Sequence, residues 1–181
     1  MDCAAKPLTM RRLDPAQSPV SEHHAMLRYW QGLSRDRMAP SWSEFDLTQI
    51  EPRVLPWTAV VDISPDMKDI RYRFWGTQLT LVRGEDFTNR PALDIPPLEL
   101  GRFIHDSYAA TAKLGKPALD IEEYVTQSGR TGSKSVLRLP LSDDGETVNK
   151  VVACMIYDVS RNGQEVAEFL ESVHAVPRKY D

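Results

Sequence analysis

The residues of this 181-residue chain that could carry catalytic or metal chemistry are few and scattered. There are four histidines (His23, His24, His105 and His174) and two cysteines (Cys3 and Cys154). No histidine has a cysteine, histidine or carboxylate partner at a compelling metal-site spacing, so we predict no bound metal. Cys154 lies in an apolar run, where a free cysteine usually behaves as a small hydrophobe, and no Gly-x-Ser-x-Gly nucleophile motif is present. These observations favour a protein that is not an enzyme.

Two acidic pairs and one glycine-bearing turn have simple structural explanations. Glu122 and Glu123 are neighbours in a predicted strand, so their side chains point to opposite faces and cannot form an acid–base pair. Asp143 and Asp144 belong to a predicted turn. The segment 129–134 lacks the length and the following helix of a phosphate-binding loop, so we interpret it as part of a hairpin.

Two arginines are more informative because they lie among apolar neighbours. Arg73 belongs to the run IRYRFW and Arg138 to the run LRLPL. An arginine that points into an apolar interior must be paired, since an unpaired buried charge is costly. The partner could be the carboxylate of a bound ligand. An internal carboxylate such as Asp62 is the simpler alternative and the one we favour.

Composition narrows the function classes. Lys and Arg total 22 against 26 Asp and Glu, for a net charge of −4, so there is no basic field of the kind that neutralises nucleic-acid phosphates. No apolar run approaches the roughly 20 residues of a membrane helix. The first residues lack the apolar core of a secretion signal, and two scattered cysteines suit a reducing compartment. We therefore expect a cytoplasmic protein that binds neither nucleic acid nor membrane.

Apolar periodicity divides the chain into elements. A helix is predicted from residue 21 to 33, with Met26, Leu27, Trp30 and Leu33 on one stripe. Strands are predicted at 57–63, 70–75, 118–127, 134–141 and 147–159, short helices at 46–51 and 77–82, and a longer helix at 96–114. We expect a disordered tail over 1–20, one domain over 21–160, and a C-terminal amphipathic helix with a tail over 161–181. This order predicts an α+β fold whose antiparallel sheet carries helices on one face.

The same order resembles a PAS domain. The segment 73–79 (RFWGTQL) followed by 84–91 (GEDFTNRP) is similar to a bacterial PAS subfamily with an R-x-x-G-T-x-L … G-x-D-x-T-G signature. The lead-in of Tyr29-Trp30, Pro40 and Leu55-Pro56 is also similar, so the resemblance covers about residues 24–160. Asn89 stands where the family usually has glycine, a mild departure because asparagine tolerates the left-handed conformation.

The resemblance implies a five-stranded sheet and a sensory or protein-interaction module that acts through a signalling partner protein. It also implies a small ligand between sheet and helices, and dimerisation through the helix that precedes the core. A flavin-binding light sensor of this family needs a cysteine placed after an Asn-Arg pair. Here Asn89-Arg90 is followed by Pro91 and no cysteine is nearby, so covalent flavin photochemistry is disfavoured. Haem would require His105, which we interpret as a surface residue. We therefore predict no cofactor. An enzyme of unrecognised type on an α+β scaffold is the alternative.

Two sets of residues follow from this interpretation. The candidate pocket comprises Phe74, Leu79, Phe103, Tyr108, Val125, Leu137, Leu139 and Ile156, with Arg73 and Arg138 as possible polar anchors. A filled apolar core is the alternative for most of them. The candidate homodimer interface is the stripe of Met26, Leu27, Trp30 and Leu33. Its alternative is a monomer in which this helix covers the chain's own sheet.

Overall fold

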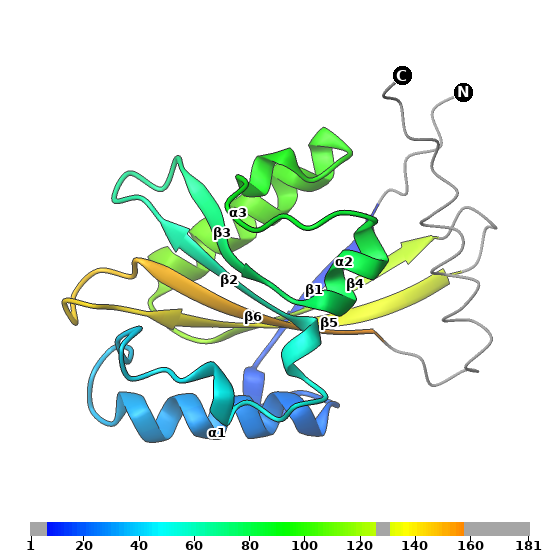
Figure 1. The fold of residues 1–181 in the computed structure, drawn as a ribbon. Coiled ribbons are helices and arrows are strands. Elements are labelled where there is room, and N and C mark those ends of the chain that lie inside the picture. The colour runs from blue at the N-terminus through cyan, green and yellow to red at the C-terminus, as the bar shows by residue number, and fades with distance from the viewer. Residues whose placement is uncertain (1–6, 126–130, 158–181) are drawn as a thin grey trace.

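A computed structural model describes residues 7–125 and 131–157 and shows one antiparallel sheet (Figure 1). Within these residues the sheet has six strands in the order β1-β4-β5-β6-β2-β3. Their bounds are Pro7–Leu13 (β1), Thr58–Ile63 (β2), Ile70–Trp75 (β3), Ala118–Val125 (β4), Thr131–Leu141 (β5) and Lys150–Tyr157 (β6). Strands β5 and β6 are therefore central, and β1 and β3 form the edges.

Helices lie on both faces of this sheet. Helix α1 (Ser21–Ser34) covers one face, whereas α2 (Thr77–Arg83) and α3 (Leu98–Leu114) lie on the other (Figure 1). Single 3-10 turns lie at Pro15–Gln17, Leu47–Gln49, Leu55–Trp57 and Ala92–Asp94. Gly84 and Gly115 end α2 and α3 in the left-handed conformation, with φ of 75° and 63°. Asn89 has φ of 65°, which is the conformation expected where the PAS signature has glycine.

The predicted order of two strands, short helices, a longer helix and three strands is confirmed, and the fold is α+β and PAS-like. The expected number of five strands is corrected, because the described residues form six. The additional strand, β1, lies within the stretch 1–20 that we expected to be a disordered tail. Its seven residues show no apolar period, and it is held by pairing with β4 and by an ion pair from Arg12 to Asp120. Both interactions are long-range, so local sequence patterns do not reveal them.

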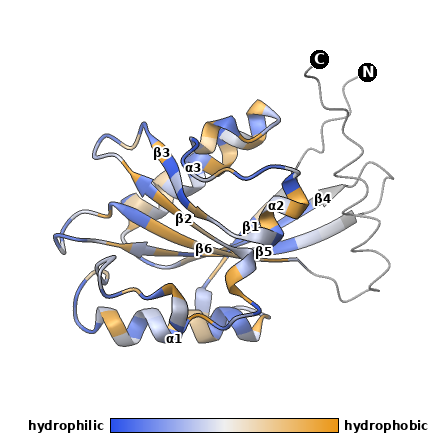
Figure 2. Cartoon of the chain, in the orientation of Figure 1, coloured by the Kyte–Doolittle hydropathy of each residue, from blue (hydrophilic) through white to orange (hydrophobic). Residues whose placement is uncertain are grey.

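Two apolar clusters lie on the two faces. The cluster under α1 contains Leu119, Leu137, Leu139, Leu141, Val152 and Cys154 from the sheet. The cluster under α2 and α3 contains Val61, Tyr72, Trp75, Val136, Val151 and Ala153. Successive residues of β5 and β6 point to opposite faces, so these two strands supply both clusters, and hydrophobic stretches recur along the strands of the sheet (Figure 2). We call these sides the α1 face and the α3 face.

A β-bulge in β3 changes which side chains share a face. Val60 pairs with Phe74 and Val61 with Tyr72, so Arg73 is an extra residue between the two pairs. Tyr72 packs on the α3 face and Phe74 on the α1 face. Strict alternation along IRYRFW predicts both aromatic rings on one face, and the bulge separates them.

Helix α1 uses its apolar stripe within the chain. Met26, Leu27 and Trp30 are buried and Leu33 packs partly buried in the same cluster. The Trp30 indole nitrogen donates a hydrogen bond to the carbonyl of Pro140, at 2.7 Å. The stripe covers the chain's own sheet, which was the alternative to a dimer interface. The homodimer stays a prediction and would need another surface; the expected C-terminal helix falls outside the described residues.

Candidate functional site

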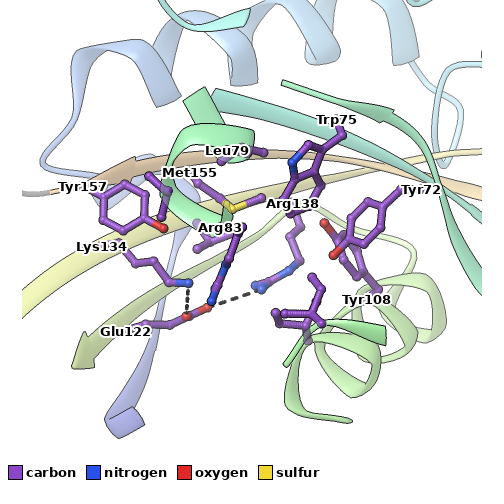
Figure 3. A pocket seen from close by; sticks show the side chains of 14 residues that line it. Tyr72, Trp75, Leu79, Arg83, Tyr108, Glu122, Lys134, Arg138, Met155 and Tyr157 are labelled. Atoms are coloured by element: carbon purple, nitrogen blue, oxygen red, sulfur yellow. Dashed lines mark hydrogen bonds and ion pairs between the residues drawn. The ribbon is translucent and has the colours of Figure 1, made fainter. Parts of the chain in front are cut away.

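A small cavity lies between the sheet and helices α2 and α3 (Figure 3). Its volume is about 20 Å³, and its walls come from β3, α2, α3, β4, β5 and β6. The apolar and aromatic part of the wall includes Tyr72, Trp75, Leu79, Ile104, Tyr108 and Met155. The charged part consists of Arg83, Glu122, Lys134 and Arg138.

Arg138 is the central charged residue of this site. It lies on β5 between Leu137 and Leu139, and alternation turns it to the α3 face, where its side chain is 3% exposed. Its two terminal nitrogens donate to Asp120 at 2.7 Å and to Glu122 at 3.5 Å. The expectation that a buried arginine is paired with an internal carboxylate is confirmed for Arg138. Its Nε atom has no hydrogen-bond partner among the described residues.

These ion pairs extend across three neighbouring strands. Lys134 lies opposite Glu122 in the β4–β5 register, with 2.9 Å between Nζ and Oε2. On the other side Arg12 of β1 donates to Asp120 at 2.8 and 3.1 Å. We call the series Arg12–Asp120–Arg138–Glu122–Lys134 the ion ladder; Figure 3 shows its end at the cavity.

Opposing effects set the charge of Glu122. Burial is the largest single influence and acts to raise the pKa of this carboxyl. The charges of Lys134 and Arg138 act in the opposite direction and prevail, so the pKa of Glu122 lies below its ordinary value. Glu122 is therefore an anion that holds two buried cations in place, and it is no proton donor at neutral pH.

An aromatic group forms the wall opposite the ladder. The rings of Tyr72 and Trp75 meet edge to face with centroids 4.7 Å apart, and Tyr108 meets Tyr72 similarly at 6.2 Å. Burial raises the pKa of Tyr108 to about 12 and that of Tyr72 well above its ordinary value, so both phenols are neutral. The Trp75 indole nitrogen is buried and has no hydrogen-bond partner in the described part of the chain.

The structure brings together only part of the predicted pocket. Leu79, Tyr108 and Arg138 line the cavity. The side chains of Phe74, Leu137, Leu139 and Ile156 instead pack on the α1 face, so their predicted place in this pocket is corrected. Both faces of the central strands are buried and apolar, and the sequence pattern does not distinguish them. Phe103 packs at the margin of the α3-face cluster, and the side chain of Val125 falls outside the described ones.

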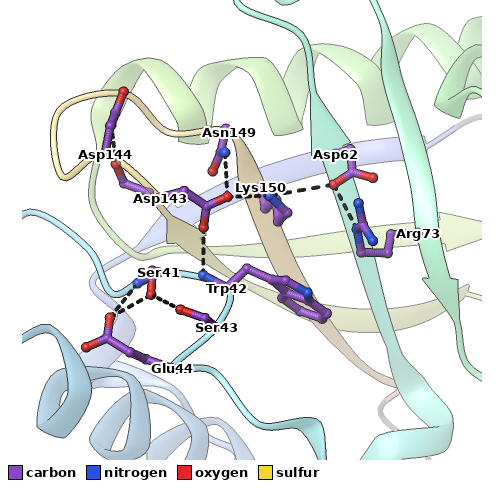
Figure 4. A network of polar contacts seen from close by, with 11 residues as sticks. Ser41, Trp42, Ser43, Glu44, Asp62, Arg73, Asp143, Asp144, Asn149 and Lys150 are labelled. Carbon is purple, nitrogen blue, oxygen red and sulfur yellow. Dashed lines mark hydrogen bonds and ion pairs between the residues drawn. The ribbon is translucent and has the colours of Figure 1, made fainter.

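Arg73, the other proposed anchor, lies away from the cavity. It is exposed rather than directed into the apolar interior, and its Nε donates to Asp62 at 2.9 Å, the carboxylate that we favoured as its partner. Figure 4 shows this pair beside a second polar network, centred on Asp143. Asp143 accepts hydrogen bonds from Lys150 at 2.7 Å, from Asn149 at 2.8 Å and from the Trp42 amide at 2.9 Å. The network joins the loop after α1 to the β5–β6 hairpin and has a structural role.

Apart from Arg138 and Tyr108, which the sequence predicted, the residues of the ion ladder and of the aromatic wall were not among the predicted site residues. Asp120 and Glu122 lie two residues apart on β4, as do Lys134, Val136 and Arg138 on β5, so each set shares one strand face. Opposite charges repeated at this spacing on two paired strands are a signal that could have revealed the ladder. Trp75 was missed because of the bulge at Arg73.

The other candidate chemical residues have structural positions. Glu122 is buried and Glu123 exposed, which confirms that they point to opposite faces. Burial raises the pKa of the Cys154 thiol, so it is an unreactive core residue. His105 lies within hydrogen-bond distance of Asp106 and of the Lys68 carbonyl, outside the cavity wall. Among the described residues there is no cluster arranged to hold a metal ion and no helix of the length and hydropathy needed to cross a membrane.

Comparison with known proteins concerns the fold. No family model and no curated protein matches the chain. Similar solved structures include VqmA bound to DPO, with 9% identity and a TM-score of 0.46 over 62% of this chain and 57% of that chain. A PAS domain from Colwellia psychrerythraea has 10% identity and a TM-score of 0.42, over 64% of this chain and 100% of that one. A LOV protein of Rhodobacter sphaeroides has 10% identity and a TM-score of 0.41, over 74% and 86%. The chain thus spans little more than half the length of the VqmA structure that it matches.

Proposed function

We propose that this chain is a non-enzymatic sensory module of the bacterial PAS subfamily suggested by its motifs, and that it binds a small molecule in the cavity on the α3 face. A homodimer and a signalling partner protein belong to the same proposal, as implications of the PAS resemblance. The cavity supports a binding role because it combines apolar walls with a few convergent polar groups.

The observation that carries the proposal is a pair of buried donors without acceptors. The Nε atoms of Arg138 and Trp75 (Nε1 in the indole) have no hydrogen-bond partner among the described residues, and both side chains line the cavity. Buried polar groups in folded proteins are nearly always hydrogen-bonded, because each unpaired one costs about 1–3 kcal/mol. A bound molecule that offers acceptor atoms in the cavity would satisfy both donors.

The experiment is mass spectrometry of the gently purified protein under native and denaturing conditions, together with an absorption spectrum. We expect a small additional mass that is lost on denaturation, and no absorption band above the aromatic region. Trp75→Leu should abolish the additional mass, whereas Leu139→Val, on the α1 face, should retain it. A protein that carries no additional mass and gains no thermal stability from any member of a metabolite panel would contradict the proposal. A Soret or flavin band would overturn the prediction that no cofactor is bound.

A further inference from the structure

We infer that the molecule bound in the cavity is a small carboxylate, of the size of formate or acetate. This inference rests on the proposed function and adds the chemical class of the ligand. Three independent properties of the cavity lead to it: its charge balance, its unpartnered donors and its volume.

The charge balance of the wall favours an anion. Arg83, Lys134 and Arg138 line the cavity, and Glu122 is the one carboxylate among the described residues that line it. Asp120, behind the wall, binds Arg138 but is shared with Arg12. The ladder with Arg83 therefore holds four cations against two carboxylates. Its buried members balance, with Lys134 and Arg138 against Asp120 and Glu122, and the Arg12 side chain is 42% exposed. The surplus charge at the cavity is therefore that of the half-buried Arg83, which an anion would neutralise and a neutral ligand would not.

Arg83 is the cation with the most freedom to meet a ligand. It is half-buried in the last turn of α2 and has no ion-pair partner within 4.0 Å among the described residues. Its charge nevertheless acts on the site, since it contributes to lowering the pKa of Glu122. Figure 3 shows its side chain directed toward the cavity between Lys134 and Arg138.

The unpartnered donors fit the oxygen atoms of a carboxylate. The Arg138 side chain is 3% exposed and Trp75 6%, and each keeps one N–H without a partner in the described part of the chain. A carboxylate offers two oxygens with four acceptor positions, so it can accept hydrogen bonds from both N–H groups and form an ion pair with Arg83. Charge-assisted hydrogen bonds of this kind are about twice as strong as neutral ones.

The volume limits the size of this acid. A cavity needs roughly 10–15 Å³ on the same measure to hold one water molecule. The observed value of about 20 Å³ therefore leaves room for a ligand of very few heavy atoms without movement of the walls. Water alone would satisfy the donors but would leave Arg83 without a counter-ion, which is why we assign an acid rather than a water site.

The test is calorimetric titration of the full chain with acetate, formate and the neutral isostere acetamide at constant ionic strength. We expect saturable binding of one acid per chain and at least tenfold weaker binding of acetamide. Arg83→Gln and Trp75→Phe should each weaken acetate binding by roughly fivefold to tenfold, because each removes one interaction and leaves the wall intact. The matched controls are Arg28→Gln, on the exposed side of α1, and Trp42→Phe, outside the cavity. Both should bind acetate with the affinity of the unmodified protein.

Equal binding of acetate and acetamide, or unchanged binding in both cavity variants, would overturn the inference. Identification of a neutral molecule by native mass spectrometry would also overturn it, while the proposed ligand-binding function would stand. If no ligand of either class binds, both the inference and the proposed function fail. Thermal unfolding of each variant, measured in the same buffer, separates lost binding from lost folding.

Discussion

The two faces of the sheet differ in what they bury. On the α1 face, β5 contributes Leu137, Leu139 and Leu141, which are fully buried beneath α1 in an apolar cluster. On the α3 face, the same strand contributes Arg138 to the ion ladder and to the wall of a cavity. Alternation in one strand thus supplies a closed core on one side and a polar site on the other. The comparison indicates that apolar packing stabilises the α1 face of this strand, whereas ion pairs among buried charges stabilise its α3 face.

The largest expected effect is on the α3 face. Asp120→Ala removes a fully buried carboxylate that binds both Arg12 and Arg138. Breaking a buried pair leaves an uncompensated charge, so we expect a loss of about 3–5 kcal/mol in the free energy of unfolding, measured with urea. Asp62→Ala, which breaks the exposed pair with Arg73, is the control and should cost less than about 1 kcal/mol. Equal losses in the two variants would remove the distinction between ladder and surface pairs.

The matching experiment on the α1 face is Leu139→Ala. Leu139 is fully buried in the apolar cluster, so the cavity left behind should cost about 3 kcal/mol in the free energy of unfolding. Because Leu139 points away from the ladder, the affinity of the folded protein for acetate should be unchanged. A large change in acetate affinity with little change in stability would place Leu139 at the ligand site and reverse our assignment of the faces.

A dependence of stability on pH should come from His23 in α1. Burial lowers the pKa of His23 to about 4 from its ordinary 6.5. Between these values the unfolded chain binds a proton that the folded protein does not, so stability falls as the pH falls through this window. The shift corresponds to roughly 3 kcal/mol in total. Urea unfolding at several pH values should give a shallower dependence for His23→Gln; identical dependences would exclude His23 as its source.

The smallest expected effect concerns the contact of α1 with β5. Trp30→Phe keeps an aromatic ring in the apolar cluster but removes the hydrogen bond to the Pro140 carbonyl. We expect a loss of about 1 kcal/mol in the free energy of unfolding. Light scattering on the same variant should give the oligomeric state of the unmodified protein, because the stripe of α1 is buried within the chain. A variant that changes from dimer to monomer would return the interface to this helix.

The sequence predicted the elements better than it predicted the site. The order of strands and helices and the stripe of α1 follow from local periodicity, which the fold preserves. The faces could not be assigned, because one extra residue at Arg73 turns Phe74 away from Tyr72. The ladder depends on the register that sets Glu122 opposite Lys134, and β1 depends on partners more than 100 positions away, such as Arg12 with Asp120. Register and long-range pairing are properties of the assembled sheet.

The most direct test of the difference between the faces compares two indole N–H resonances during an acetate titration of ¹⁵N-labelled protein. Trp75 lies in the cavity wall without a partner in the described part of the chain, whereas Trp30 donates to Pro140 at 2.7 Å inside the closed core. Spectra of Trp75→Phe and Trp30→Phe assign the two signals. We predict that the Trp75 resonance shifts and saturates while the Trp30 resonance stays in place. A Trp75 resonance that does not move, or two resonances that move together, would contradict the account.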